Sequence, residues 1–298
     1  MATELKIFQT MIRLTLPKLK KKVRSFWGLN PPDLVVSLVP NFNKVMHEAL
    51  RDELPGVPYV TVLTDMADYP PHFWMEPRQG QYIICGTAFA ASQAATLGYD
   101  QRSIFTTSGM ILRPDFYRRQ SVNKTVQLEE MGLDPNVLTG LILFGGHGSS
   151  EMLQIAKALP DRQLIFMAGH NTALAKKMAT QSASAKHHVM GFVKDIHLVM
   201  HVCDYFVGKP GPGSLSEAVH MGLPVITFRN GSTMPQERYN TVWLEGNQLG
   251  KVIESVSELP GALEALLSEL PLYHGHVQQM NNQAVFEVVD ALGAIKAG

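Results

Sequence analysis

Cysteine is nearly absent from this chain of 298 residues, which contains only Cys85 and Cys203. Both lie inside apolar runs, so we expect buried thiols in a reducing compartment and no disulfide framework. Two such cysteines cannot build a cysteine-based metal site, and no Asp-x-Asp sequence that would chelate manganese is present. The sequence therefore predicts a protein without a bound metal or other cofactor.

Long apolar runs and an excess of one charge are missing as well. No run of about 18 apolar residues occurs, so nothing in the sequence is expected to span a bilayer. The 26 basic and 26 acidic residues give a formal net charge of zero, which argues against nucleic acid as a partner. The N-terminus lacks the pattern of a signal peptide, so a cytoplasmic protein is expected.

The common nucleotide-binding fingerprints are also absent. The chain has neither a complete G-x-x-x-x-G-K-[ST] nor a complete G-x-G-x-x-G. A nicotinamide-dependent dehydrogenase is disfavoured, because the G-x-G-x-x-G motif and the acidic residue that follows the second strand in such enzymes are both missing.

One segment near the N-terminus is strongly basic. Residues 16–27 carry five cations next to Phe26 and Trp27. One interpretation is peripheral contact with an anionic membrane, with both aromatic side chains at the headgroup level. The other is the solvated face of an amphipathic helix whose apolar side packs on the core. That apolar side would contain Ile7, Met11 and Leu14.

Short apolar runs alternate with helix-length segments in the first half of the chain. Strands are expected over residues 34–39, 58–64, 82–85 and 104–107, with helices over 43–53 and 87–97. Buried runs of this length separated by helices indicate a parallel α/β sheet. A polar, basic stretch at 113–120 predicts the domain link, so we expect domains at 1–115 and 116–298.

The second half repeats this pattern. Strands are expected over 141–144, 164–168, 188–190, 205–207 and 224–228. Helices are expected over 149–158, 171–181, 195–201 and 214–221, followed by C-terminal helices only. The prediction is an α/β protein with two Rossmann-like domains facing a cleft. Ligands of such sheets bind beyond the carboxyl ends of the strands, where this chain places its glycines.

The most informative turn lies between the strand at 205–207 and the following helix. Gly211 and Gly213 allow close backbone approach, and the first amides of a helix beginning near Ser214 favour a phosphate. The same residues also fit a capping box, in which Ser214 and Glu217 bond each other's backbone amides. The residues alone leave both interpretations of Glu217 open.

A second glycine turn follows the strand at 141–144. Gly145, Gly146 and Gly148 surround His147 ahead of Ser149 and Ser150, either of which could cap a helix. Two such turns in one sheet are better evidence for a diphosphate site than either alone.

Three segments carry a family resemblance when taken in order. They are Gly191-Phe-Val-Lys-Asp-Ile196, Lys209-Pro-Gly-Pro-Gly-Ser-Leu-Ser-Glu217 with Gly222-Leu-Pro224, and Pro235-Gln-Glu-Arg-Tyr-Asn240. Together they resemble the donor domain of family 28 glycosyltransferases, most closely its glycolipid branch, which includes monogalactosyldiacylglycerol synthases and bacterial diacylglycerol glucosyltransferases. The resemblance covers most of residues 30–250. It implies the GT-B architecture and metal-independent transfer of a hexose from a UDP-sugar to a lipid such as diacylglycerol.

The resemblance also implies roles for individual residues. The backbone of Phe192 and Val193 would receive the uracil edge, Glu217 would accept from the ribose hydroxyls, and Gln236 and Glu237 would bind the sugar. The helix terminus, with Lys209, would stabilise the charge on UDP. The implied donor site comprises Gly145, Gly146, His147, Phe192, Val193, Lys209, Gly211, Pro212, Gly213, Ser214, Leu215, Glu217, Gln236 and Glu237.

In the first half, residues 60–77 resemble the Thr-Asp and His-Pro-x-Trp stretch of the glycolipid branch. Asp65 and His72 are the candidate general bases for the attacking hydroxyl, although the sequence here is Pro71-His72. The alternative is that Asp65 caps the following turn and His72 packs in the loop.

One departure from the family concerns the start of the chain. No Gly-Gly-Gly-His loop precedes residue 30, so the first domain is expected to be incomplete, and His147 of the second domain does not replace that loop. This departure motivates an alternative, a nucleotide-sugar-binding protein without transfer activity. A UDP-N-acetylhexosamine epimerase would require a set of acids around the sugar that the sequence does not show.

Overall fold

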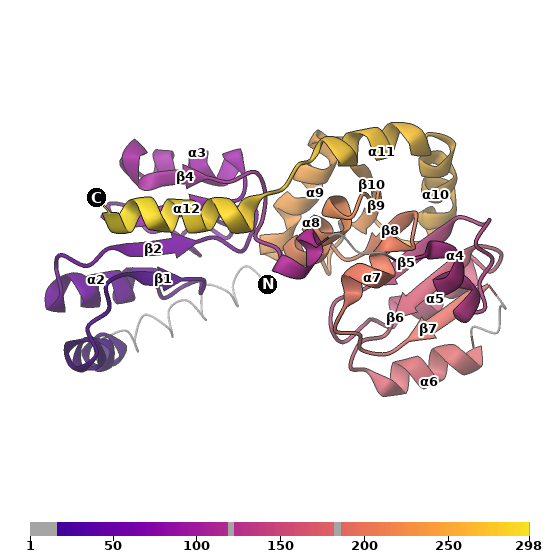
Figure 1. Ribbon diagram of the computed structural model, residues 1–298, viewed down its shortest axis with the longest axis horizontal. Helices are drawn as coiled ribbons and strands as arrows, with labels where there is room; N and C mark the ends of the chain where they lie inside the picture. The colour runs from indigo at the N-terminus through magenta and orange to yellow at the C-terminus, as the bar shows by residue number, and fades with distance from the viewer. Residues whose placement is uncertain (1–16, 119–121, 182–185, 298) are drawn as a thin grey trace. The chain divides into compact units, whose positions relative to one another are not determined.

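The computed structural model describes residues 17–118, 122–181 and 186–297. They form two compact units: unit 1 contains the described residues up to Ile111 and from Gln283 onward, and unit 2 is Leu112–Asn282. Each unit is built around its own parallel sheet with helices packed on it (Figure 1). The predicted α/β class is confirmed.

Unit 1 has a four-stranded parallel sheet in the order β1-β2-β3-β4. Its strands are β1 Val35–Ser37, β2 Tyr59–Val62, β3 Tyr82–Cys85 and β4 Ile104–Thr106, with helices α2 Asn43–Glu53 and α3 Ala88–Thr96. Every residue of β2 is buried, as expected for a central parallel strand covered on both faces. Thr87 caps α3 by accepting from the amide of Ala90 at 3.1 Å.

The last helix, α12 (Ala284–Ala297), belongs to unit 1, whereas the sequence placed it with the second domain. Its residues Val288, Ala291 and Ile295 pack in one buried cluster with β2 and Ile84. In Figure 1 this helix lies in yellow along the purple strand β2. The predicted link at 115 lies within a few residues of the division at Leu112.

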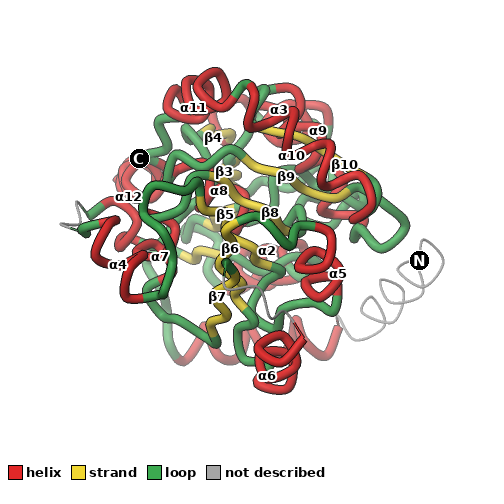
Figure 2. The backbone as a smooth tube through the Cα atoms, turned by 90° about the vertical axis from the view of Figure 1, so that its right-hand side faces the viewer, coloured by secondary structure: helices red, strands yellow, loops and turns green. Residues whose placement is uncertain are grey.

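Unit 2 has a six-stranded parallel sheet in the order β10-β9-β8-β5-β6-β7, which can be followed in Figure 2. The strands are β5 Thr139–Leu143, β6 Gln163–Met167, β7 His187–Met190, β8 Tyr205–Gly208, β9 Val225–Phe228 and β10 Gly250–Ile253. The expectation of helices alone after residue 228 was wrong, because β10 pairs with β9 at the sheet edge. With only Ile253 buried, β10 lacks the apolar run that would reveal it.

Helices cover both faces of this sheet. They are α4 Lys124–Glu130, α5 Glu151–Ala158, α6 Thr172–Gln181, α7 Ile196–His201, α8 Pro212–His220, α9 Arg238–Gly246, α10 Leu259–Ser268 and α11 Leu270–Gln279, with short 3-10 turns at Pro114–Tyr117, Pro235–Glu237 and Val256–Glu258. One buried cluster joins α5, α6 and α10 to the central strands, with Phe166 and Leu263 fully buried.

The basic segment forms a helix over residues 17–29. Trp27 is buried in a cluster with Ala49 and Leu50, so its predicted place at a lipid headgroup is wrong. Phe26, in contrast, is 61 % exposed. The apolar positions Ile7, Met11 and Leu14 of the alternative interpretation lie outside the described residues.

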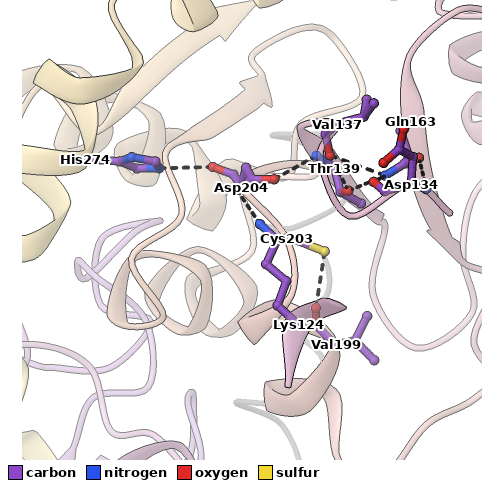
Figure 3. Close-up of polar contacts among 9 residues, drawn as sticks. All are labelled: Lys124, Asp134, Val137, Thr139, Gln163, Val199, Cys203, Asp204 and His274. Atoms are coloured by element: carbon purple, nitrogen blue, oxygen red, sulfur yellow. Dashed lines mark hydrogen bonds and ion pairs between the residues drawn. The ribbon is translucent and has the colours of Figure 1, made fainter. Parts of the chain in front are cut away.

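A polar network closes the amino ends of β5, β6 and β8 (Figure 3). The Asp204 carboxylate accepts from Lys124 Nζ at 2.6 Å and from the Thr139 amide at 2.8 Å. Gln163 donates to Thr139 Oγ1 at 2.8 Å and accepts from the Asp134 amide at the same distance. The polar groups of these side chains are already hydrogen-bonded to one another at the amino ends of the strands. A ligand is therefore expected at the opposite, carboxyl edge of the sheet.

Both cysteines are free and buried, as predicted. Burial raises the pKa of Cys85 to about 12 and raises that of Cys203 as well. The thiol of Cys203 donates to the carbonyl of Val199. Both side chains act as small core residues.

Candidate nucleotide-sugar site

The strand order of unit 2 changes direction at β5, which pairs with β6 on one side and with β8 on the other. Leu143 and Gly208 are partners at the carboxyl ends of these strands. The two glycine turns found in the sequence therefore leave the sheet side by side. A switch of this kind opens a crevice at the carboxyl edge, where ligands of α/β sheets bind.

Helix α8 begins at Pro212, with Gly211 as its cap and no side-chain capping bond. The predicted start at Ser214 and the capping box with Glu217 are therefore wrong. Proline is favoured in the first helical turn because its φ is already helical. The first helical bond runs from the Leu215 amide to the Gly211 carbonyl, which leaves the amides of Gly213 and Ser214 without helical acceptors. This terminus presents donors suited to an anion.

The turn ahead of α8 is held by two side chains from the segment after β9. Lys209 Nζ lies 3.0 Å from Glu237 Oε1, and Asn240 Nδ2 donates to the Pro210 carbonyl at 2.7 Å. A side chain at Gly211 would meet Lys209 Cε at 3.5 Å, so the ammonium group lies beside the helix terminus. The turn therefore combines backbone donors with a cation.

A pocket of about 180 Å³ lies next to this terminus. It is lined by Leu143, Gly145, Gly146, Met167, Gly169, Phe192, Val193, Ile196, Ser214 and Glu217. We call it the first pocket. Six residues that the sequence singled out, from three separate segments, meet there with Met167 and Gly169 because β5, β6, β7 and β8 all end at the same sheet edge.

A second pocket, of about 320 Å³, is lined from the other side of the Lys209 turn. It is formed by Phe144, Gly148, Ser149, Glu151, Lys209, Pro210, Phe228, Asn230, Ser232, Thr233, Met234 and Glu237. Its lining contains hydroxyl, amide and carboxylate groups, which suit a ligand with several hydroxyls. Residues 228–234, which contribute five of these positions, were not singled out from the sequence.

Three residues predicted to bind the donor have surroundings that differ from those the prediction implied. Glu237 is expected to bind the sugar, but one of its oxygens already contacts Lys209, and its side chain is only 7 % exposed. His147 is exposed, and neither it nor Gln236 is among the described residues that line the two pockets. The Gln236 amide instead contacts the sulfur of Met234 at 3.6 Å.

Glu217 has its carboxyl group in the first pocket, where burial raises its pKa and the charge of Arg113 partly opposes that rise. Arg113 also donates to the Lys194 carbonyl at 3.1 Å and lies over the Phe116 ring. Sequence analysis treated Arg113 only as part of the domain link. The one feature of the sequence that could have pointed to Arg113 is its place directly ahead of Pro114, at the start of unit 2.

Glu217→Gln is expected to stabilise the protein at pH 7. A carboxyl whose pKa is raised in the folded state binds protons more tightly there, so stability falls as pH rises from its ordinary value of 4.5 through the raised value. The neutral amide avoids this cost. Thermal unfolding at pH 3.5 and pH 7 should show a higher Tm for the variant only at pH 7. An equal gain at both pH values would contradict the assignment of the cost to the charge.

The turns after β5 and β6 are in close contact. Gly169 has φ +61°, and the His170 amide donates to the Gly146 carbonyl at 2.8 Å. A Cβ at Gly169 would lie 2.1 Å from the Gly146 carbonyl oxygen. Glycine at 169 is therefore required for the two turns to approach and to line the first pocket together.

In unit 1, the candidate bases lie in the loop between β2 and β3. Asp65 accepts from the Trp74 indole at 2.9 Å, and His72 Nδ1 lies 3.3 Å from the Met75 carbonyl. The loop is organised by Asp68, which sequence analysis missed. Its buried carboxylate accepts from the amides of His72 and Trp74, and burial raises its pKa.

No group of three or more His, Cys, Asp or Glu side chains that could hold a metal ion occurs in the part of the chain that the structure describes. Metal independence remains a prediction.

Comparison with known proteins decides the family. The model of the glycosyltransferase family 28 C-terminal domain matches residues 142–294, about half of the chain. The chain belongs to glycosyltransferase family 28. The matched region begins within β5 and includes every segment of the two pockets.

Family members with similar sequences are glycolipid synthases. Monogalactosyldiacylglycerol synthase 1 of Arabidopsis thaliana is 28 % identical over 242 residues, covering 76 % of this chain and 44 % of that protein. The Spinacia oleracea monogalactosyldiacylglycerol synthase is 30 % identical over 242 residues, covering 76 % and 45 %. The chain thus spans less than half the length of these two relatives.

Solved structures of glycosyltransferases share the fold of this family 28 member. MurG of Acinetobacter baumannii matches with a TM-score of 0.67 at 14 % identity, covering 95 % of this chain and 80 % of that one. An Anabaena protein solved with UDP matches with a TM-score of 0.62 at 14 % identity, covering 94 % and 82 %. A UDP-N-acetylglucosamine 2-epimerase matches with a TM-score of 0.62 at 15 % identity, covering 92 % and 74 %. The likeness confirms the GT-B architecture, which transferases and epimerases share.

Proposed function

We propose that this protein transfers a hexose from a UDP-sugar to the hydroxyl of a lipid, with diacylglycerol as the favoured acceptor. The observation that carries the proposal is the pair of pockets that flank the anion-binding start of α8. A nucleotide-sugar has the same three parts in the same order, a nucleoside, a diphosphate and a sugar. The lipid acceptor is inferred from the relatives, which are monogalactosyldiacylglycerol synthases.

In this proposal the first pocket holds the nucleoside. The backbone of Phe192 and Val193 meets the uracil edge, and Glu217 accepts from the ribose hydroxyls. Burial raises the pKa of Glu217, and the nearby charge of Arg113 partly opposes that rise and so favours the ionised, accepting form. With no capping bond to make, Glu217 is free for this role.

The diphosphate lies at the segment from Gly211 to Leu215, against the amides of Gly213 and Ser214. The sugar occupies the second pocket with the remaining oxygen of Glu237, and Gln236, which contacts Met234 of that lining, would turn toward the sugar on binding. In the reaction the acceptor oxygen bonds to the anomeric carbon, and the bond from that carbon to the β-phosphate oxygen breaks. The hydroxyl proton passes to a base, for which Asp65 and His72 are the candidates. Backbone amides and Lys209 stabilise the charge that develops on UDP.

Contact with an anionic membrane is proposed through the helix at residues 17–29. Lys20 and Arg24 are committed to Asp52 and Glu53 on α2. The opposite face of the helix carries Lys18 and Lys22 beside Phe26 and Leu29, which is 83 % exposed. Cations interleaved with exposed apolar side chains are typical of a helix that lies in the headgroup region.

We further propose that the protein lies peripherally on the cytoplasmic face of the membrane. No helix among residues 17–118, 122–181 and 186–297 is long and apolar enough to cross a membrane. The attraction is expected to be electrostatic and therefore to weaken at high salt.

Replacing Lys18 and Lys22 by glutamine and Phe26 by serine is expected to reduce binding to anionic vesicles by about tenfold or more. Two cations near a charged surface contribute roughly 1 kcal/mol each, and the phenylalanine adds an apolar contact. Cosedimentation with phosphatidylglycerol vesicles at low salt measures the effect. Lys176→Gln with Lys177→Gln, in the middle of α6, is the charge-matched control. Equal sedimentation of all three proteins would remove this surface from the proposal.

The function itself is tested in two steps with the full chain. Calorimetric titration with UDP first measures nucleotide binding, and transfer from UDP-galactose or UDP-glucose to diacylglycerol in mixed micelles is then followed by lipid chromatography. We expect binding and transfer without added metal. UDP binding with no transfer to any lipid hydroxyl would favour the binding protein without activity, and no UDP binding would overturn the donor site.

A further inference from the structure

Phe192, which lines the first pocket, stacks against the ring of His170. The ring centroids of His170 and Phe192 are 4.0 Å apart, and the ring planes differ by 17°. His170 lies in the turn after β6, and Phe192 follows β7, so the stack joins the loops of neighbouring strands. Phe192 is 59 % exposed and lines the pocket, yet its ring has a fixed partner.

The histidine side of this stack is held firmly. The His170 amide donates to the Gly146 carbonyl, and Gly169 packs tightly against that same carbonyl. The next residue, Asn171, accepts from the Leu174 amide at 2.9 Å in the first turn of α6. His170 therefore projects from a turn whose backbone is fixed on both sides.

The loop that carries Phe192 has fewer constraints. Arg113 holds the Lys194 carbonyl at 3.1 Å, and the His170 ring holds the Phe192 ring. Gly191 has only one neighbouring atom within 4 Å of a built Cβ, so it does not restrain the start of the loop by packing. The ring stack is thus one of the contacts that set the position of the backbone at Phe192.

We infer that His170 is a positioning residue for the nucleobase: its ring fixes Phe192 and, through it, the backbone that meets the edge of a pyrimidine base. This inference rests on the proposed nucleotide-sugar function. Without the stack, the exposed phenyl ring would sample other rotamers and the loop would lose one of its anchors. An aromatic pair of this geometry is expected to change affinity by about fivefold. Loss of the stack should weaken binding of the nucleobase and leave the contacts to the diphosphate unchanged.

The experiment compares His170→Ala, His170→Phe and wild type. His276→Ala is the matched control, because that imidazole also contacts an aromatic ring in unit 2, edge-on to Tyr273 at 6.5 Å. Affinity for uridine and for UDP is measured by NMR titration, and amide hydrogen exchange of residues 191–195 is measured in the free proteins. We expect the alanine variant to bind both ligands about fivefold more weakly and to exchange faster at Val193. The phenylalanine variant should match wild type in both measurements.

The inference is overturned if His170→Ala binds uridine as wild type does, or if His170→Phe is as weak as the alanine variant. Loss of UDP affinity with unchanged uridine affinity would also overturn it, since the effect would then lie at the phosphates. If wild type binds neither ligand, the proposed function fails. The exchange rate at Val193 then decides alone whether His170 holds this loop.

Discussion

Lys209→Met is expected to weaken UDP binding roughly 10- to 100-fold, because it removes the cation beside the start of α8. The same change removes the ion-pair partner of Glu237, whose side chain is only 7 % exposed. An unpaired carboxylate at this depth destabilises the fold by about 1–3 kcal/mol. Binding and stability should therefore fall together.

A second variant separates the two effects. In Lys209→Met with Glu237→Gln, no buried charge remains unpaired, so stability should recover toward the wild-type value. UDP affinity should stay low, since the cation is still absent. Stability is measured by urea unfolding and affinity by calorimetry.

The matched control lies at the other end of the same sheet. Lys124 pairs with Asp204 at 2.6 Å, with the lysine side chain 36 % and the aspartate 16 % exposed. Lys124→Met should lower stability by a comparable amount and leave UDP binding unchanged. Recovery of UDP affinity in the double variant would show that Lys209 serves only to neutralise Glu237.

Gly169→Ala is expected to lower the free energy of unfolding by about 2–4 kcal/mol and to abolish detectable UDP binding. The backbone at 169 has φ +61°, and the new Cβ would lie 2.1 Å from the Gly146 carbonyl oxygen. The contact is with backbone, which no side-chain rotation can relieve, so the two turns must move apart. Their separation would open the wall of the first pocket that Gly146 and Gly169 share.

Gly132→Ala provides the control for backbone strain alone. Gly132 has φ +73° at the end of α4, but nothing lies within 4 Å of a built Cβ. It should cost about 1 kcal/mol, the strain of a left-handed alanine, and leave ligand binding intact. Urea unfolding of both variants measures the difference. Equal losses would show that strain, and not the contact between the two turns, dominates at position 169.

Several elements could be predicted from local patterns. The helix Asn43–Glu53 and the strand Tyr82–Cys85 have the predicted bounds, because apolar spacing and turn residues mark both ends. The two glycine turns were also found locally. The start of α8 was misplaced because Ser214-Leu-Ser-Glu217 matches a capping pattern while Pro212 provides the competing signal, a residue preorganised for the first helical turn.

Other features depend on contacts between distant segments. Trp27 and Phe26 are adjacent in a basic run, yet only the packing of the helix on Ala49 and Leu50 decides which of them is buried. Arg113 acts on Glu217 across about a hundred residues of sequence. Asp68 is buried and accepts from the amides of His72 and Trp74, whereas Asp65 accepts from the Trp74 indole. Local spacing carries no information on such pairings.

The sequence by itself determined the α/β class, the position of the two glycine turns and the family to which the chain belongs, because these follow from periodicity and from short segments with their own conformational preferences. Only the tertiary structure decided that α12 packs on the first sheet, that Lys209 is held by Glu237, and that the helix terminus has pockets on both sides. The physical reason is the strand order. Parallel pairing of β5 with both β6 and β8 brings turns from four distant segments to one edge, where their backbone donors and charges act together.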